Sequence, residues 1–153
     1  METVGTIGSD LRTLQLGPLW VLSALAGTHA NFRSYELEAF WDSLVAVTLR
    51  TASPAQDILR STAADRLRLL ADFTTDDRPV VSGLRHIVAI LDRGPDDLAE
   101  SYKVALLRIG LAVARSRGPY GRALTPEDEQ MLLLLAELLE LDSESELIAG
   151  VLV

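Results

Sequence analysis

Residues 124–141 read LTPEDEQMLLLLAELLEL, and this stretch decides the fold class. A threonine followed by proline and three acidic residues is typical of a helix start, because Thr125 can cap exposed amides and Pro126 fits the first turn. The apolar residues that follow recur at the three- and four-residue intervals of one helix face. The pattern therefore predicts a helix with a wide apolar stripe, formed by Met131, Leu134, Leu135, Leu138 and Leu141.

The same succession of start signal, apolar stripe and Gly or Pro stop recurs along the chain. The expected helices start near Asp10, Ser34, Ser53, Pro79, Asp97, Thr125 and Ser143. The third is expected to bury Leu67 and Phe73, with an interruption at Ser61-Thr62. We therefore expect an all-α fold, a compact bundle of about seven helices. Residues 1–9 are expected to form a flexible N-terminus, and residues 10–153 a single helical domain.

Composition narrows the classes of function. The 153 residues are 48% hydrophobic and 24% charged, with no cysteine, which excludes disulfides, thiolate metal sites and cysteine nucleophiles. A formal net charge of -8 argues against nucleic acid as a partner, because binding it needs a basic surface. The longest uninterrupted apolar run, Met131 to Ala136, is far short of a membrane span. These features predict a cytoplasmic protein without a membrane span.

Two segments, Leu19 to Leu44 and Leu106 to Leu135, look like copies of one unit. Each contains an apolar helix, a loop of small residues and a new helix that opens with Ser/Thr-x-Glu-x-Glu. Either the chain has two pseudo-repeated halves, or any two capped amphipathic helices would align in this way.

This arrangement resembles the TerB-like family of tellurite-resistance and related helical domains. The resemblance rests on IGLAVA at 109–114, on LTPEDE at 124–129 after a Gly-containing loop, and on VLSALA at 21–26 followed by Tyr35-Glu36. It covers residues 14 to 142, and it implies a helical domain in a stress-response or biosynthetic setting.

Family members usually have Asp-Gly early in each loop, and these acidic groups have been regarded as a metal site. This sequence has His29-Ala30 in the first loop and Arg115 to Gly118 in the second, so both aspartates are missing. Only Glu36 and Glu127 carry over. A metal site here would use His29, Glu36, His86 and Glu127, whereas the alternative reading makes the histidines structural and the glutamates ordinary first-turn carboxylates.

Basic residues gather before the last predicted helices. From Ser101 to Arg122 there are five basic residues and no acid, and from Ala123 to Val153 eight acids and no base. The segment 115–122 is expected to be a loop that could hold a phosphate or carboxylate. Alternatively, its arginines neutralise the acidic stretch that follows. The candidate ligand-binding residues are Arg115, Arg117, Tyr120 and Arg122.

Three functional hypotheses follow. The first is a non-catalytic TerB-like binding module that recognises a protein partner, a second copy of itself or an acidic ligand through the arginine loop. The sequence identifies no cofactor for it. The second is a metal-dependent or small-molecule-processing enzyme with the His/Glu pocket between the two halves. The third, suggested by small size and acidity, is an immunity-type protein.

Replacement of one stripe residue tests the all-helical core. Each fully buried leucine stabilises a fold by roughly 1.5–3 kcal/mol, and a buried unpaired carboxylate is costly in addition. We expect Leu135→Asp to unfold the domain, seen as loss of the helical circular dichroism signal at 25 °C. A fully helical variant would contradict the predicted stripe.

Overall fold

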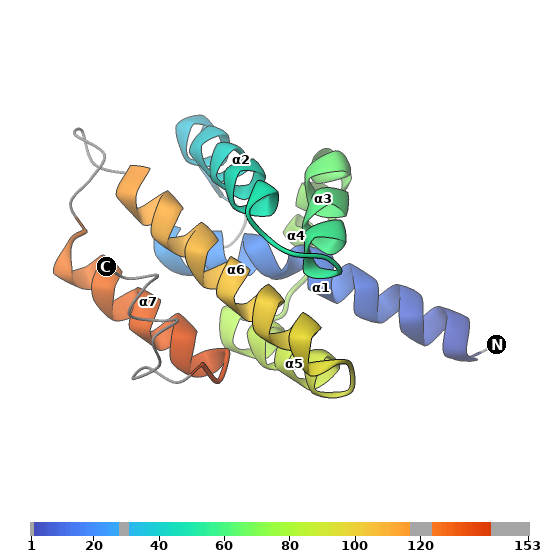
Figure 1. The fold of residues 1–153 in the computed structure, drawn as a ribbon. Coiled ribbons are helices and arrows are strands. Elements are labelled where there is room, and N and C mark those ends of the chain that lie inside the picture. The colour runs from blue at the N-terminus through green and yellow to red at the C-terminus, as the bar shows by residue number, and fades with distance from the viewer. Residues whose placement is uncertain (1, 28–30, 117–123, 142–153) are drawn as a thin grey trace.

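The computed structural model describes residues 2–27, 31–116 and 124–141, with side chains from Ser9 onward. These residues form seven α-helices and no strand (Figure 1), which confirms the all-α prediction. Within this part of the chain, no helix is long and apolar enough to cross a membrane. The helices are α1 (Glu2–Ala26), α2 (Ser34–Leu49), α3 (Ala55–Ala64), α4 (Arg66–Thr75), α5 (Val80–Asp92), α6 (Asp96–Ser116) and α7 (Pro126–Leu138).

The bounds of two expected helices differ in the structure. Helix α1 begins at Glu2 rather than at Asp10, and its first turns extend beyond the other helices at the right of Figure 1. The expected third helix is two helices, because the helical conformation is interrupted at Asp65, between α3 and α4. The helix predicted from Ser143 lies outside the described residues. The described part of the chain still has seven helices, because one predicted helix is split into α3 and α4.

Hydroxyl groups near the end of α3 mark the break. Oγ of Ser61 donates to the carbonyl of Ile58 at 2.6 Å, and Oγ1 of Thr62 lies within 3.2 Å of the same oxygen. Such side-chain bonds compete with the helical ladder and bend it. Because α4 starts a new helical phase after Asp65, Leu67 points outward and is 78% exposed. The prediction that Leu67 is buried was wrong.

Helix α1 runs through the middle of the molecule and contacts all six other helices. In Figure 1, α6 crosses in front of it, α2 and α3 lie above, and α5 and α7 lie below. Every residue from Thr13 to Ser23 is buried. A helix enclosed in this way is expected to be apolar on nearly all sides, as this segment is.

Pro18 lies inside this central helix. Proline has no N–H, so the carbonyl of Leu14, four residues earlier, loses its usual helical donor. The hydroxyl of Tyr102 on α6 donates to that carbonyl instead. The next carbonyl along the helix, that of Gln15, accepts a hydrogen bond of 3.1 Å from Thr62 on α3. Two helices therefore supply donors at the point where α1 is weakened.

The close approach of α5 to α1 depends on a glycine. A side chain at Gly83 would overlap the indole ring of Trp20, which is fully buried. The Trp20 ring in turn meets Phe73 of α4 edge to face, with centroids 6.1 Å apart. This aromatic contact ties α4 to the same point on α1.

Helix α7 packs on the bundle with a different face from the one predicted. Its buried side chains are Leu132, Leu135, Ala136 and the following Leu139. Leu135 was predicted correctly, but Leu134 is 44% exposed. Because leucines surround most of this helix, their spacing alone could not select the face that meets α1, α5 and α6.

The donor role of Tyr102 can be measured with a double-mutant cycle. We expect Tyr102→Phe to lower the free energy of unfolding by about 1–3 kcal/mol, because the Leu14 carbonyl is then buried without a partner. In a Pro18→Ala background, residue 18 again has an N–H for that carbonyl, so the same change should cost less. Urea denaturation of the four proteins gives the coupling energy, and equal costs in both backgrounds would contradict this role.

Burial also raises the pKa of Tyr102, so its hydroxyl keeps its proton in the folded state. The unfolded tyrosine ionises near pH 10. Stability should therefore fall above about pH 10, and it should fall less steeply in Tyr102→Phe.

Candidate ligand-binding site

The predicted arginine loop is only partly a loop. Arg115 lies in the last turn of α6, so the expectation of a loop from residue 115 was wrong for this residue. Arg117, Tyr120 and Arg122 lie outside the described residues. The continuous apolar face of α6 carries the helix past the point where the sequence pattern predicted its end.

Arg115 lines a groove between α2 and α6. One wall of the groove is formed by α6, with Arg108, Leu111, Ala112 and Arg115. The opposite wall is formed by Ala46 and Val47 of α2 and by Arg50, which caps the C-terminal end of α2. The spacing of the four α6 residues is i, i+3, i+4, i+7, which places them along one side of the helix. The groove has a volume of about 480 Å³. We call it the arginine groove.

A second hollow continues the arginine groove toward the start of α6. It has a volume of about 240 Å³ and shares Arg50 and Arg108 with the first. Glu100, Ser101 and Val104 line its α6 side. Together the two hollows form an elongated track along α6, with arginines at its middle and at one end.

The guanidinium groups of the groove differ in how they are engaged. Arg115 takes part in an interaction within the chain. Arg50 and Arg108 are exposed, and neither lies within ion-pair distance of a carboxylate in the described part of the chain. An arginine presents several donors in a fixed plane and binds carboxylate or phosphate through two parallel hydrogen bonds. The groove can therefore recognise an anionic ligand.

Sequence reasoning found one of these three arginines. The spacing of seven between Arg108 and Arg115 was a usable signal, because it places both on one helix face. Arg50 gave no signal, since it belongs to a different helix and only the packing of α2 on α6 brings it near.

Glu36, one of the four predicted metal ligands, takes part in capping helix α2. Helix α2 has Arg33 at its N-cap rather than the expected Ser34, and the backbone N–H of Arg33 donates to Oε1 of Glu36 at 2.9 Å. Glu36 also lines a cavity of only about 10 Å³ between α1, α2 and α6. That volume is about enough for one water molecule.

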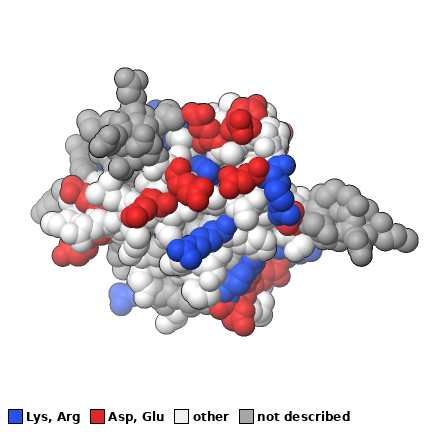
Figure 2. Space-filling model, turned by 90° about the horizontal axis from the view of Figure 1, so that it is seen from below, with Lys and Arg blue, Asp and Glu red and all other residues white. Residues whose placement is uncertain are grey.

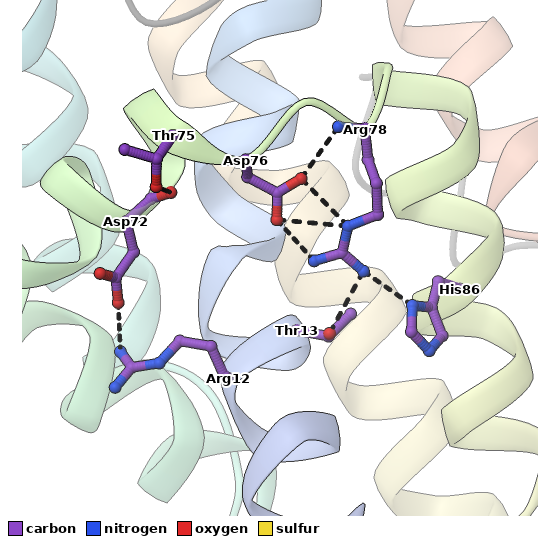
Figure 3. Close-up of polar contacts among 7 residues, drawn as sticks. All are labelled: Arg12, Thr13, Asp72, Thr75, Asp76, Arg78 and His86. Carbon is purple, nitrogen blue, oxygen red and sulfur yellow. Dashed lines mark hydrogen bonds and ion pairs between the residues drawn. The ribbon is translucent and has the colours of Figure 1, made fainter.

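His86 belongs to a polar cluster at the start of α5 (Figure 3). Nη1 of Arg78 lies 2.7 Å from Nδ1 of His86, and a guanidinium only donates, so this nitrogen accepts and the ring proton is on Nε2. Two other nitrogens of Arg78 bind the carboxylate of Asp76, the shorter bond being 2.7 Å. The Arg78 guanidinium also lies over the Trp20 ring, 4.8 Å from its centroid. The structure therefore gives His86 a partner within the fold.

Glu127 lies in the first turn of α7. It is the second residue of α7 and is exposed, beside Asp128, whose N–H is capped by Thr125 at 3.1 Å. His29 lies outside the described residues. Across the rest, no group of three histidines or carboxylates is placed to hold a metal ion. The four predicted ligands are thus not brought together as far as the structure describes them.

The surface charge is mixed on the face that Figure 2 presents. Acidic side chains form a band there, and basic side chains lie beside it rather than in one continuous area. A duplex needs an extended basic surface, which this face does not offer.

Comparison of the chain with protein-family models, with curated proteins and with solved structures found no match.

Replacement of Arg78 tests the structural role of the His86 cluster. We expect Arg78→Met to lower the free energy of unfolding by about 1–3 kcal/mol, because the Asp76 side chain is only 15% exposed and would lose the guanidinium that binds both of its oxygens. Arg93→Met is the matched control, since its pair with Asp10 is at the surface and is worth less than about 1 kcal/mol. Equal losses in urea denaturation would show that the cluster adds nothing beyond a surface ion pair.

Proposed function

We propose that this domain is a non-catalytic binding module that recognises an acidic segment of a partner protein through the arginine groove. The observation that carries the proposal is the convergence of Arg50, Arg108 and Arg115 on one groove in a chain with a net charge of -8. Three positively charged guanidinium groups on one side of an acidic protein raise the local concentration of an anionic ligand there.

The lining of the groove suits such a ligand. Its floor is made of small and aliphatic side chains, among them Ala46, Leu111 and Ala112, with arginines around it. An apolar floor strengthens ion pairs formed above it, because it lowers the local dielectric constant. The volume lies within the range of about 300–1,000 Å³ that is usual for binding pockets.

The elongated shape favours a peptide over a compact anion. The arginine groove continues into the second hollow through Arg50 and Arg108. A single phosphate or citrate would occupy one end of this track, whereas an extended chain with several carboxylates would pair with Arg50 and Arg108 and reach as far as Arg115.

The setting of this activity is part of the proposal. The resemblance to TerB-like domains suggests an adaptor in a stress-response or biosynthetic process, and the proposed location is the cytoplasm.

The experiment is a titration with a labelled peptide of glutamate and aspartate, followed by fluorescence anisotropy. We expect a triple replacement, Arg50→Gln with Arg108→Gln and Arg115→Gln, to weaken binding by about tenfold or more, because each lost charge-assisted bond is worth roughly 1.5–3 kcal/mol before solvent screening.

The matched control is the triple replacement Arg60→Gln, Arg66→Gln and Arg85→Gln. These arginines are exposed on α3, α4 and α5, and their loss changes the net charge by the same amount. Binding should be nearly unchanged in this control. Equal weakening in both triple variants, or tighter binding of citrate or inorganic phosphate than of the peptide, would contradict the proposal.

A further inference from the structure

Helix α7 carries a second apolar stripe that the bundle does not cover. Leu133 and Leu134 are 45% and 44% exposed, on the side turned away from the buried Leu132 and Leu135. Met131 and Leu138 beside them are half-buried. A surface helix usually has one apolar face, so a second one indicates an interaction surface.

Two hollows follow this outer stripe. One, of about 350 Å³, lies between α7, the end of α1 and the start of α5, where Val81 is 42% exposed. The other, of about 630 Å³, is lined by Gln130, Leu133, Leu134, Glu137 and Leu141. Leu134 lines both, so the two adjoin at this residue. We call them together the leucine groove.

The leucine groove has the length and residue spacing to accommodate a second helix. The residues of its larger hollow that lie on α7 are spaced i, i+3, i+4, i+7, and they therefore run along about two turns of the helix, with Leu141 just after its end. An amphipathic helix that lies in such a groove inserts side chains at the same spacing. The exposed leucines would meet the apolar side of that helix.

Charge identifies the kind of helix. Glu137 lines the groove, and Glu127, Glu129 and Glu140 are exposed on or directly after the same helix. The chain has eight acids and no base from Ala123 onward. Helix α7 and Glu140 after it thus carry acids and no base. We call these side chains the acidic rim, and acidic groups on an occupant would be repelled by them.

From this we infer that the leucine groove binds a basic amphipathic helix of a partner protein. A second copy of this chain would bring its own acidic α7 against the acidic rim. The chain's own segment 142–153 has three acids and no base, so its charge is also of the wrong sign. This surface is distinct from the arginine groove, and either one can exist without the other.

The probe is a fluorescein-labelled peptide of leucine and lysine, patterned as an amphipathic helix. Anisotropy titration of the full chain is expected to show binding that weakens as salt is added, because the rim charges are exposed. A peptide of the same composition with its leucines scattered around the helix should bind at least about tenfold more weakly, since charge alone does not fill the groove.

Two double variants test whether the peptide binds at the leucine groove. Leu133→Ser with Leu134→Ser is expected to weaken binding by about tenfold or more, because the apolar anchors of the groove are lost. Leu49→Ser with Leu67→Ser is the matched control, since these leucines are 70% and 78% exposed elsewhere, and it should bind as the unmodified chain does. Circular dichroism checks that both variants remain helical.

Three outcomes would overturn the inference. Equal binding by both leucine variants would show attraction by net charge alone. A dimer in sedimentation equilibrium that Leu133→Ser with Leu134→Ser dissociates would make a second copy the occupant. A monomer that does not bind the patterned peptide would point to the chain's own apolar end, Ile148 to Val153, as the occupant.

Discussion

A proline in the middle of the central helix removes one backbone donor, and the packing of three helices depends on replacing it. The carbonyl of Leu14 is buried, so it needs a partner from elsewhere in the fold. Tyr102 of α6 supplies the hydroxyl, and Thr62 of α3 serves the neighbouring carbonyl of Gln15. These bonds fix where α6 and α3 cross α1. The position of α6 in turn sets one wall of the arginine groove, so the geometry of this candidate site depends on an interaction inside the core.

Much of the fold could be predicted because its signals are local. Thr125 caps α7 as its sequence indicated, and the all-α class follows from apolar spacing repeated along the chain. The errors concern which face of a helix is inside. Leu67 and Leu134 were both expected in the core, yet one follows a break in the helix and the other lies on a helix with leucines almost all round. Tertiary contacts decide which face of such a helix is buried, and the spacing of apolar residues does not reveal these contacts.

The candidate site was harder to predict, because it joins residues from different helices. The run of basic residues before Arg122 was visible in the sequence, and it led to Arg115. The sequence also allowed the arginines of residues 115–122 to pair with the acidic stretch that follows. Of these, Arg115 takes part in an interaction within the chain, and Arg117 and Arg122 lie outside the described residues. For His86, the residue type alone was misleading. Its residue type suggested a ligand, whereas its environment, beside the Arg78 guanidinium, is that of a residue held within the fold.

The contact between Leu14 and Tyr102 spans 88 residues, which affects how the chain folds as it is made. A ribosome adds roughly 5–20 residues per second, so α1 emerges several seconds before α6. During that interval the central helix can pack only on α2 to α5, and the side that α6 covers stays in water. The nascent domain therefore completes its core late, and until α6 has been made it is a natural client for a chaperone.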